Sequence, residues 1–190
     1  MDRALQQQLL ARLATDREFR ERFFADPARV AASEGLTVAA EALAQLHQEQ
    51  MRQFARLLRT RRLAQVSLRL PLTRKALGTR FADHFRNSAV DPSSASQRPS
   101  EDALGFARFL VEAHDAGLPA WALSLARYEA ASLDAEEHNR GLVVRCLPHA
   151  VRRLTELLAT AIAPEGSHQR LSLAIWWRGS ASSRLQHWLW

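Results

Sequence analysis

The sequence is poor in the residues that mark several common kinds of protein. It contains one cysteine, Cys146, which excludes an internal disulfide and any metal site built from several cysteines. Its seven glycines are scattered rather than grouped as in a phosphate-binding loop or a dinucleotide fingerprint, so nothing indicates nucleotide binding. A chain with this little cysteine fits a reducing compartment.

Long apolar segments are lacking as well. No apolar run approaches the ~18 residues that a membrane-spanning helix needs. The opening residues, MDRALQQQLL, have neither the charged-then-apolar order nor the cleavage site of a signal peptide. We therefore expect a cytoplasmic protein without a membrane segment.

The residues that are present indicate a folded chain. Of the 190 residues, 47% are hydrophobic and 24% are charged, which suits one large domain or two small ones rather than a disordered segment. Basic residues outnumber acidic ones by 26 to 20, and all of them except Lys75 are arginine. Two explanations fit this bias: the codon usage of a GC-rich genome, and selection for the bidentate anion binding that arginine does better than lysine.

The first half of the chain has the composition and punctuation of a helical bundle. Asp16 can cap the helix after it, and Pro27 suits the first turn of the next helix. A long helix is expected to end at Leu70 because Pro71 comes next. Thr73 can then cap another helix. The apolar face of that helix is expected to consist of Leu77, Phe81 and Phe85.

Residues 88–100 separate this helical part from the rest of the chain. They contain five serines and two prolines, which predicts a loop or linker. After residue 140 the pattern changes from helical spacing to β-branched and aromatic runs. The sequence therefore predicts an α+β protein, with a helical domain over 1–135 and a small α/β domain over 136–190.

The expected order of elements in the smaller domain is strand, helix, strand, strand. Residues 142–144 favour the first strand, and the segments 170–178 and 184–190 predict a β-hairpin with a turn between them. Apolar residues at helical spacing over 150–162 predict the helix, although residues 149–154 can also be extended.

Side chains with catalytic or metal-binding chemistry do not form a recognisable motif. His138, Cys146 and His149 are the closest such grouping, but zinc ligands usually come in pairs two to five residues apart. A lone cysteine in an apolar strand is usually an inert small hydrophobic residue. The residues thus indicate no catalytic residue, no metal site and no cofactor of the protein's own.

Positive charge is concentrated in one stretch. Residues 52–86 hold ten basic residues against one acidic residue, a net charge of +9, so the rest of the chain is net acidic. Arg52, Arg56 and Arg59 recur on one face of the expected helix. That face can be a solvated surface, can receive an acidic protein, or can track nucleic-acid phosphates. Neither interleaved aromatic residues nor a recognition-helix motif accompanies the stretch, which disfavours nucleic acid.

Aromatic residues gather at the end of the sequence. Four of the five tryptophans lie in the last fifteen residues, on the two strands of the expected hairpin and on both of its faces. One small helix cannot cover both faces of a hairpin. Either another part of the protein covers the second face, or that face is a docking surface, for which tryptophan is a favoured residue. An edge strand there can also accept an added strand.

Four stretches of the sequence resemble a bacterial protein family. They are LLARLATDREFRERFFADPARVAASEGLT, FARLLRTRRLAQVSLRLPLTRKALGTRFADHFR, LPAWALSLARYEAA and RLSLAIWWRGSASSRLQHWLW. Together they cover most of the chain. The family consists of partner proteins encoded beside multinuclear-iron TIM-barrel oxidases in gene clusters for ribosomally made peptide natural products. It is related to sequences labelled as DNA-binding domains.

The resemblance implies a helical N-terminal part joined to a winged-helix-like C-terminal part. It also implies a non-catalytic accessory subunit, which binds a precursor (leader) peptide and presents it to a partner iron-dependent oxidase. The iron would belong to the oxidase, and nucleic acid is not expected as a partner. The rival interpretation is a DNA-binding or regulatory protein that uses the basic residues of 52–86.

This interpretation assigns two sets of residues. The terminal hairpin is expected to accept the peptide as an additional strand, with apolar slots beside the neighbouring helix and arginines that hold acidic leader residues. The expected peptide-binding residues are Arg152, Arg153, Leu154, Leu158, Trp188, Leu189 and Trp190. The expected partner-binding residues are Arg52, Arg56, Arg59 and Trp176.

Overall fold

The structure is a computed structural model that describes residues 3–33, 47–88, 99–112, 117–160, 169–180 and 183–190. Its elements are mostly helices, with a small antiparallel sheet near the C-terminus, which confirms the predicted α+β class. No helix within these ranges is long and apolar enough to cross a membrane. The loop or linker predicted over 88–100 falls almost wholly on residues 89–98, outside the described ones.

The chain divides into two compact units. Unit 1 comprises Met1–Arg62 and Asp91–Gln97, and unit 2 comprises Leu63–Val90 and Arg98–Trp190. The long helix α5 (Gln48–Arg69) contributes residues to both units. The compact unit that contains the sheet therefore begins far before residue 136, where the sequence predicted the smaller domain to start.

Unit 1 contains α1 (Arg3–Thr15), α2 (Arg17–Ala25), α3 (Pro27–Ser33) and the first part of α5. Asp16 caps α2 as predicted, because its carboxylate accepts a hydrogen bond of 2.9 Å from the Phe19 N–H. Pro27 begins α3, also as predicted. A cluster of buried apolar side chains forms the core of this unit: Leu9, Leu13, Ala14, Phe19, Phe23 and Met51.

Between α5 and the sheet, the described helices of unit 2 are α6 (Pro71–Leu77), α7 (Arg80–Asn87), α8 (Pro99–Glu112) and α9 (Ala120–Glu137). Helix α5 ends at Arg69, just before Leu70 and Pro71, as predicted. The single helix expected to start at Thr73 and run through Phe85 is wrong on two points. Helix α6 begins before Thr73, at Pro71, and Gly78 separates it from α7.

Gly78 breaks this helix because of its backbone geometry. Its φ is +55° and its ψ is −129°, a combination that residues with a Cβ rarely adopt. A Cβ at this position would meet no atom within 4 Å, so a substitution there strains the backbone without a side-chain clash.

Replacing Gly78 with alanine should therefore lower the free energy of unfolding by about 1–2 kcal/mol, through backbone strain alone. Gly141 is the matched control, because a Cβ there also meets open space while its φ lies outside the left-handed range. Gly141→Ala should change stability by no more than about 0.5 kcal/mol. Urea denaturation of both variants measures the difference, and equal effects would contradict this explanation of the helix break.

An aromatic cluster holds α7 and α8 together. The ring of Phe106 in α8 lies edge-on to those of Phe81 and Phe85 in α7, with centroids 5.1 and 5.3 Å apart. Both phenylalanines of α7 and Leu77 of α6 are buried in this core, as their helical spacing predicted.

A buried carboxylate joins α6 to α9. Glu129 accepts hydrogen bonds from the N–H groups of Leu72 and Thr73, at 2.6 and 2.8 Å, and from the Thr73 hydroxyl at 2.7 Å. The N–H groups of the first helical turn have no partner within the helix, so Glu129 supplies acceptors that α6 lacks. Thr73 thus uses its hydroxyl to bind α9, not to cap a helix.

The sheet of unit 2 consists of β1 (Leu142–Leu147), β2 (Ser172–Trp177) and β3 (Gln186–Leu189), in that spatial order and antiparallel throughout. Helix α10 (Val151–Ala159) connects β1 to β2. The predicted order of strand, helix, strand, strand is confirmed, as is the terminal hairpin. The alternative of an extended segment over 149–154 is wrong from Val151 onward, because α10 begins there.

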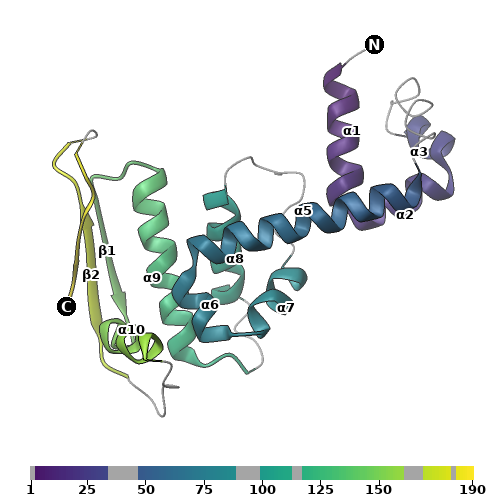
Figure 1. Cartoon of the computed structure of the whole chain (residues 1–190). Coiled ribbons are helices and arrows are strands. Elements are labelled where there is room, and N and C mark those ends of the chain that lie inside the picture. Colours follow the sequence, from purple (N-terminus) through teal and green to yellow (C-terminus); the bar gives the residue numbers. More distant parts are fainter. Residues whose placement is uncertain (1–2, 34–46, 89–98, 113–116, 161–168, 181–182) are drawn as a thin grey trace. The chain divides into compact units, whose positions relative to one another are not determined.

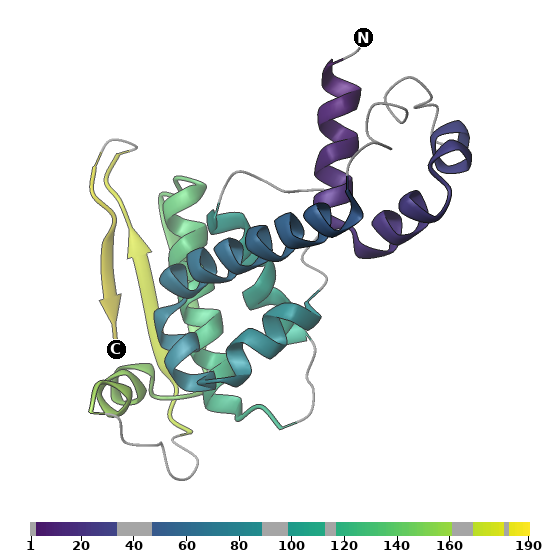
Figure 2. The ribbon, with the colours of Figure 1, turned by 45° about the vertical axis from the view of Figure 1, so that its right-hand side comes forward.

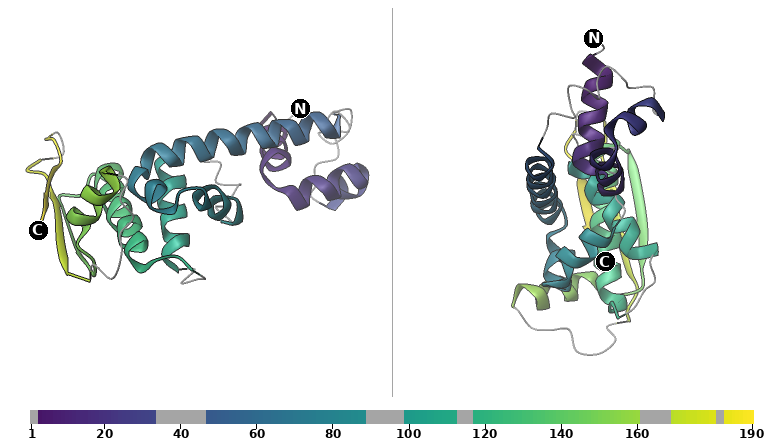
Figure 3. Two further views of the ribbon diagram at one scale, coloured as in Figure 1. Left: turned by 60° about the horizontal axis from the view of Figure 1, so that its bottom comes forward. Right: turned by 90° about the vertical axis from the view of Figure 1, so that its right-hand side faces the viewer.

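Helix α9 lies along one face of this sheet (Figures 1 and 3). Val143 and Trp176 are buried beneath it, together with Val151 and Leu154 from α10. The opposite side of α9 packs against α6 and α8. One helix therefore serves both the helical core and the sheet, which is why the compact unit does not divide near residue 135.

Candidate functional site

Two concave regions, one in each unit, contain residues that the sequence pattern assigned to binding. The first is a groove of about 380 Å³ in unit 1. We call it the arginine groove, and it is lined by Arg17, Arg20, Glu21, Arg52, Ala55, Arg56 and Arg59. The lining comes from α2 and from the first part of α5.

The sequence explains why these arginines share a groove. In α2, the apolar Phe19 and Phe23 are fully buried, which turns Arg17 and Glu21 to the outside. In α5, residues at intervals of three and four lie on one face. The predicted set of Arg52, Arg56 and Arg59 has this spacing, and the structure brings all three of them to the same groove.

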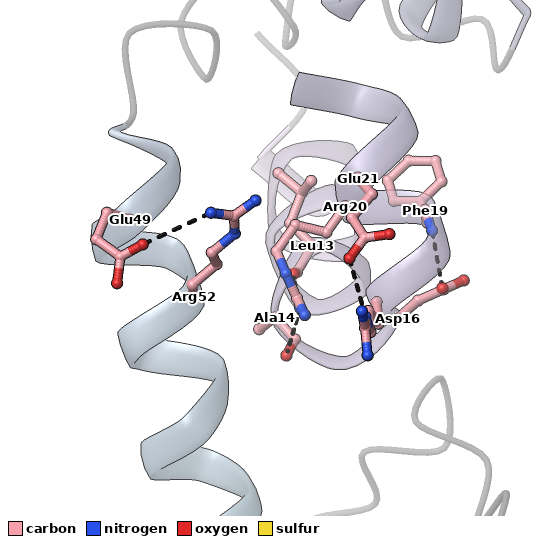
Figure 4. A network of polar contacts seen from close by, with 9 residues as sticks. Leu13, Ala14, Asp16, Phe19, Arg20, Glu21, Glu49 and Arg52 are labelled. Atoms are coloured by element: carbon pink, nitrogen blue, oxygen red, sulfur yellow. Dashed lines mark hydrogen bonds and ion pairs between the residues drawn. The ribbon is translucent and has the colours of Figure 1, made fainter. Parts of the chain in front are cut away.

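Arg20 forms the floor of the groove. Its side chain is only 7% exposed, and its guanidinium donates hydrogen bonds to the carbonyls of Leu13 at 2.8 Å and Ala14 at 3.4 Å (Figure 4). These carbonyls belong to the last turn of α1, where a helix favours positive charge. Burial lowers the pKa of Arg20, and the nearby positive charges of Arg59 and Arg52 lower it further.

Carboxylates offset this charge only in part. Arg17 donates a 2.9 Å hydrogen bond to Glu21, and this bond lowers the pKa of Glu21. Arg52 lies 3.7 Å from Glu49, on the next turn of the same helix (Figure 4). The groove lining thus holds five arginines and one glutamate. Such a concentration of guanidinium groups attracts carboxylates or phosphates from solution.

Arg17 and Arg20 are the arginines of the groove that the sequence pattern did not assign to binding. The signal for Arg17 was present in REFRERFF, where charged residues alternate with the phenylalanine face. No pattern in the sequence indicated that α2 packs beside α5, so the grouping could not be found from the spacing within either helix.

The second concave region is a cavity of about 620 Å³ in unit 2. This C-terminal cavity lies where β2 begins and β3 ends, beside α10. It is lined by Ala150, Arg152, Arg153, Glu156, Arg170, Leu171, Ser172, Leu189 and Trp190. Arg152 and Arg153 both lie within ion-pair distance of Glu156, at 3.6 and 3.3 Å. With three arginines against one glutamate, the cavity combines a positive rim with apolar walls.

The edge of β3 beside this cavity carries outward-facing backbone groups. Leu173 and Trp190 exchange two hydrogen bonds, of 3.0 and 2.9 Å, so the N–H and C=O of Trp190 point inward to β2. Antiparallel strands alternate these directions residue by residue. The N–H and C=O of Leu189 therefore point away from β2, and no described strand pairs with them.

The structure brings together four of the seven residues assigned to peptide binding, namely Arg152, Arg153, Leu189 and Trp190. Trp188 lies outside the cavity on the sheet face that points away from α9, and its ring stacks with that of Trp190. Leu154 is completely buried and Leu158 packs half-buried against the same core, so the apolar slots expected beside them are filled by the protein itself.

Trp176, assigned to partner binding, is a core residue. Its side chain is 1% exposed and packs against Tyr128 of α9 and His187 of β3, with ring centroids 5.4 and 5.1 Å away. A side chain in this position packs between the sheet and α9 and is not available to a partner. Its neighbour Trp177 points to the opposite face and is 40% exposed.

The histidines and the cysteine considered as metal ligands lie in different surroundings. His138 is exposed beside Asp134, Cys146 is exposed on β1, and His149 is buried with its Nδ1 2.7 Å from the Ser124 hydroxyl. Within the described part of the chain, no three histidine, cysteine, aspartate or glutamate side chains come together.

Comparison of the chain with protein-family models, with curated proteins and with solved structures finds no match.

Proposed function

We propose that this protein is a non-catalytic accessory subunit. It binds a precursor peptide in the cytoplasm and presents it to a partner iron-dependent oxidase that modifies ribosomally made peptides. The observation that carries the proposal is a strand edge at Leu189 that no described strand pairs with, together with a basic and apolar cavity beside it. The class of partner comes from the family resemblance, and the iron belongs to that partner.

The C-terminal cavity suits an extended peptide that carries acidic side chains. An added strand would exchange backbone hydrogen bonds with Leu189, which gives affinity without demanding one sequence. Its side chains on one side would then meet Arg152, Arg153 and Arg170, and apolar ones would contact Leu171 and Trp190. Leu154 and Leu158, which the sequence pattern assigned to the peptide, support this site from the core.

The arginine groove is the proposed docking site for an acidic surface of the oxidase. Exposed arginines mainly speed the encounter with an acidic partner and discriminate against other partners, and salt screens both effects. The same groove is the best candidate contact for the rival function, DNA binding through residues 52–86. Its glutamate and its confined volume favour a protein side chain over a continuous phosphate backbone.

The C-terminal elements support classing residues 136–190 as winged-helix-like. A strand and a helix precede a β-hairpin, and the hairpin takes the place of the wing. In this arrangement the wing presents the peptide, while the helical remainder of the protein holds the oxidase.

Peptide affinity tests the proposal. The protein is co-purified with the TIM-barrel oxidase encoded nearest to its gene, and the complex is titrated calorimetrically with the neighbouring precursor peptide. Leu189→Pro should raise the Kd about tenfold, because it removes one outward N–H and leaves the ladder to β2 in place. Leu189→Ala keeps that N–H and serves as the matched control, with a change of no more than a few-fold.

Replacement of Arg52, Arg56 and Arg59 by glutamine should lower the affinity for the oxidase and make that affinity depend less on salt. The affinity for the peptide should not change. Failure of the protein to form a complex with the oxidase, or equal peptide affinity for Leu189→Pro and Leu189→Ala, would contradict the proposal. Micromolar binding of random duplex DNA, with a steep salt dependence that the three glutamines abolish, would favour the DNA-binding function instead.

A further inference from the structure

One face of the sheet carries no described element. Helix α9 covers the other face, and in Figures 1, 2 and 3 no described helix of unit 2 lies against the side that points away from it. We call this side the open sheet face. By the strand register it presents Leu142, Val144, Cys146, Leu171, Leu173, Ile175, Trp177, Gln186, Trp188 and Trp190.

The open sheet face is almost entirely apolar. Six of its side chains are among the nine large hydrophobic residues that the described part of the chain exposes: Leu142, Val144, Leu171, Trp177, Trp188 and Trp190. Their exposed fractions run from 40% for Trp177 to 79% for Trp190. Gln186 is the only polar side chain among these positions, apart from the thiol of Cys146. A face without charge does not select a charged partner.

The area of this face approaches what a stable dimer buries. If a tryptophan side chain offers roughly 200 Å² and a leucine or valine side chain roughly three quarters of that, the exposed fractions place roughly 600 Å² of apolar surface here. That is at the upper end of the range for the largest apolar patch of a typical monomer, about 300–600 Å². It approaches the roughly 800 Å² that each partner contributes to a standard interface.

The face is also uneven in a way that a copy of itself can match. Its side chains form three columns, one for each strand. The β3 column is wide, because the rings of Trp188 and Trp190 stack 6.4 Å apart at an interplanar angle of 7°. Residues that pair across the sheet form a row. Val144 lies in the row of Trp188 and Cys146 lies in the row of Trp190, so the β1 column is narrow where the β3 column is wide.

We propose that the open sheet face binds the same face of a second copy of this chain. Two sheets pack face to face at a distance of about 10 Å with their strands nearly aligned. A two-fold axis that runs parallel to β2, midway between the sheets, keeps each row level and exchanges β1 with β3. Trp188 of each protomer then lies over Val144 of its partner, Trp190 lies over Cys146, and Ile175 meets Ile175.

This arrangement sets the wide β3 column against the narrow β1 column, as tightly packed interfaces require, while each residue of the β2 column meets its own counterpart. A two-fold axis across the strands would set the β3 column against itself and leave a gap between the β1 columns. The contact is isologous, so it closes at two copies. The dimer does not use the strand edge at Leu189. Leu171 and Trp190 belong both to this face and to the C-terminal cavity, so dimer formation and the proposed peptide binding share these two side chains.

Sedimentation velocity of the full chain over a range of concentrations tests the dimer. The wild-type protein should show a reversible monomer–dimer equilibrium. Val144→Trp places two wide side chains against each other, and Trp188→Val leaves two narrow ones, so each should raise the dimer Kd at least tenfold. The double variant Val144→Trp/Trp188→Val exchanges the two columns in these rows and should recover a Kd within a few-fold of the wild type.

The double variant distinguishes this geometry from a merely sticky surface. If the two single effects add in the double variant, Val144 does not face Trp188 of the partner and the proposed axis is wrong. A wild-type protein that remains monomeric at every concentration overturns the proposal altogether. Leu68→Arg is the control for exposed leucine, because Leu68 is 76% exposed on α5 and outside this face; it should leave the Kd unchanged, and circular dichroism checks that each variant is folded.

Discussion

Replacing Trp176 with alanine should lower the free energy of unfolding of unit 2 by about 4 kcal/mol. The indole is 1% exposed, between Tyr128 of α9 and His187 of β3, and beneath it lies the core that joins sheet to helix. The substitution leaves a cavity that α9 cannot fill without moving away from α6 and α8. Urea denaturation monitored by far-ultraviolet circular dichroism measures the loss as a shift of the midpoint.

Trp177 provides a control of the same residue type, one position along the same strand. It points to the open sheet face and is 40% exposed, so Trp177→Ala should cost about 1 kcal/mol or less when the protein is dilute enough to be monomeric. The contrast between neighbours tests the assignment of faces directly. Equal losses for the two variants would mean that α9 does not cover the face that carries Trp176.

Replacing Glu129 with alanine should cost about 3 kcal/mol, the second largest effect that we expect. Three donors lose their acceptor at once: the N–H of Leu72, the N–H of Thr73 and the Thr73 hydroxyl. These groups are too enclosed for water to replace the carboxylate fully, because Thr73 is 1% exposed and Glu129 is 6% exposed. Glu136→Ala, at an exposed position of α9, should change stability by less than about 0.5 kcal/mol.

The same carboxylate makes stability depend on pH. Burial raises the pKa of Glu129 above its ordinary value, although the hydrogen bonds from Thr73 and Leu72 oppose the change. With its pKa raised in the folded state, Glu129 contributes stability that is fully present below the unfolded pKa and is lost as the pH rises through the folded pKa.

Glu129→Gln removes this titration. The free energy of unfolding of the wild type should therefore increase relative to that of Glu129→Gln as the pH falls from neutral toward the range in which carboxylates titrate. Urea titrations at several pH values measure it, with Glu136→Gln as the control that should match the wild type. Parallel pH profiles for wild type and Glu129→Gln would show that Glu129 ionises as freely when folded as when unfolded.

The local structure of this protein is determined by its sequence. Asp16, Pro27 and Pro71 mark helix ends because capping and the proline ring act within a single turn, whatever lies nearby. Alternation along 170–178 and 184–190 likewise determined that the tryptophans divide between two faces of a hairpin. The break at Gly78 escaped prediction because glycine is tolerated within a helix and its left-handed backbone leaves no periodic trace.

The tertiary structure alone decided which faces are covered and which residues meet. Alternation separated Trp176 from Trp177, but only the packing of α9 on one side made the first a core residue and left the second exposed. Arg20 reached the arginine groove, and Glu129 reached the start of α6, through contacts between different helices. The reason is physical: periodicity records how side chains are distributed around one element, whereas burial and charge at a site depend on which other element packs against it.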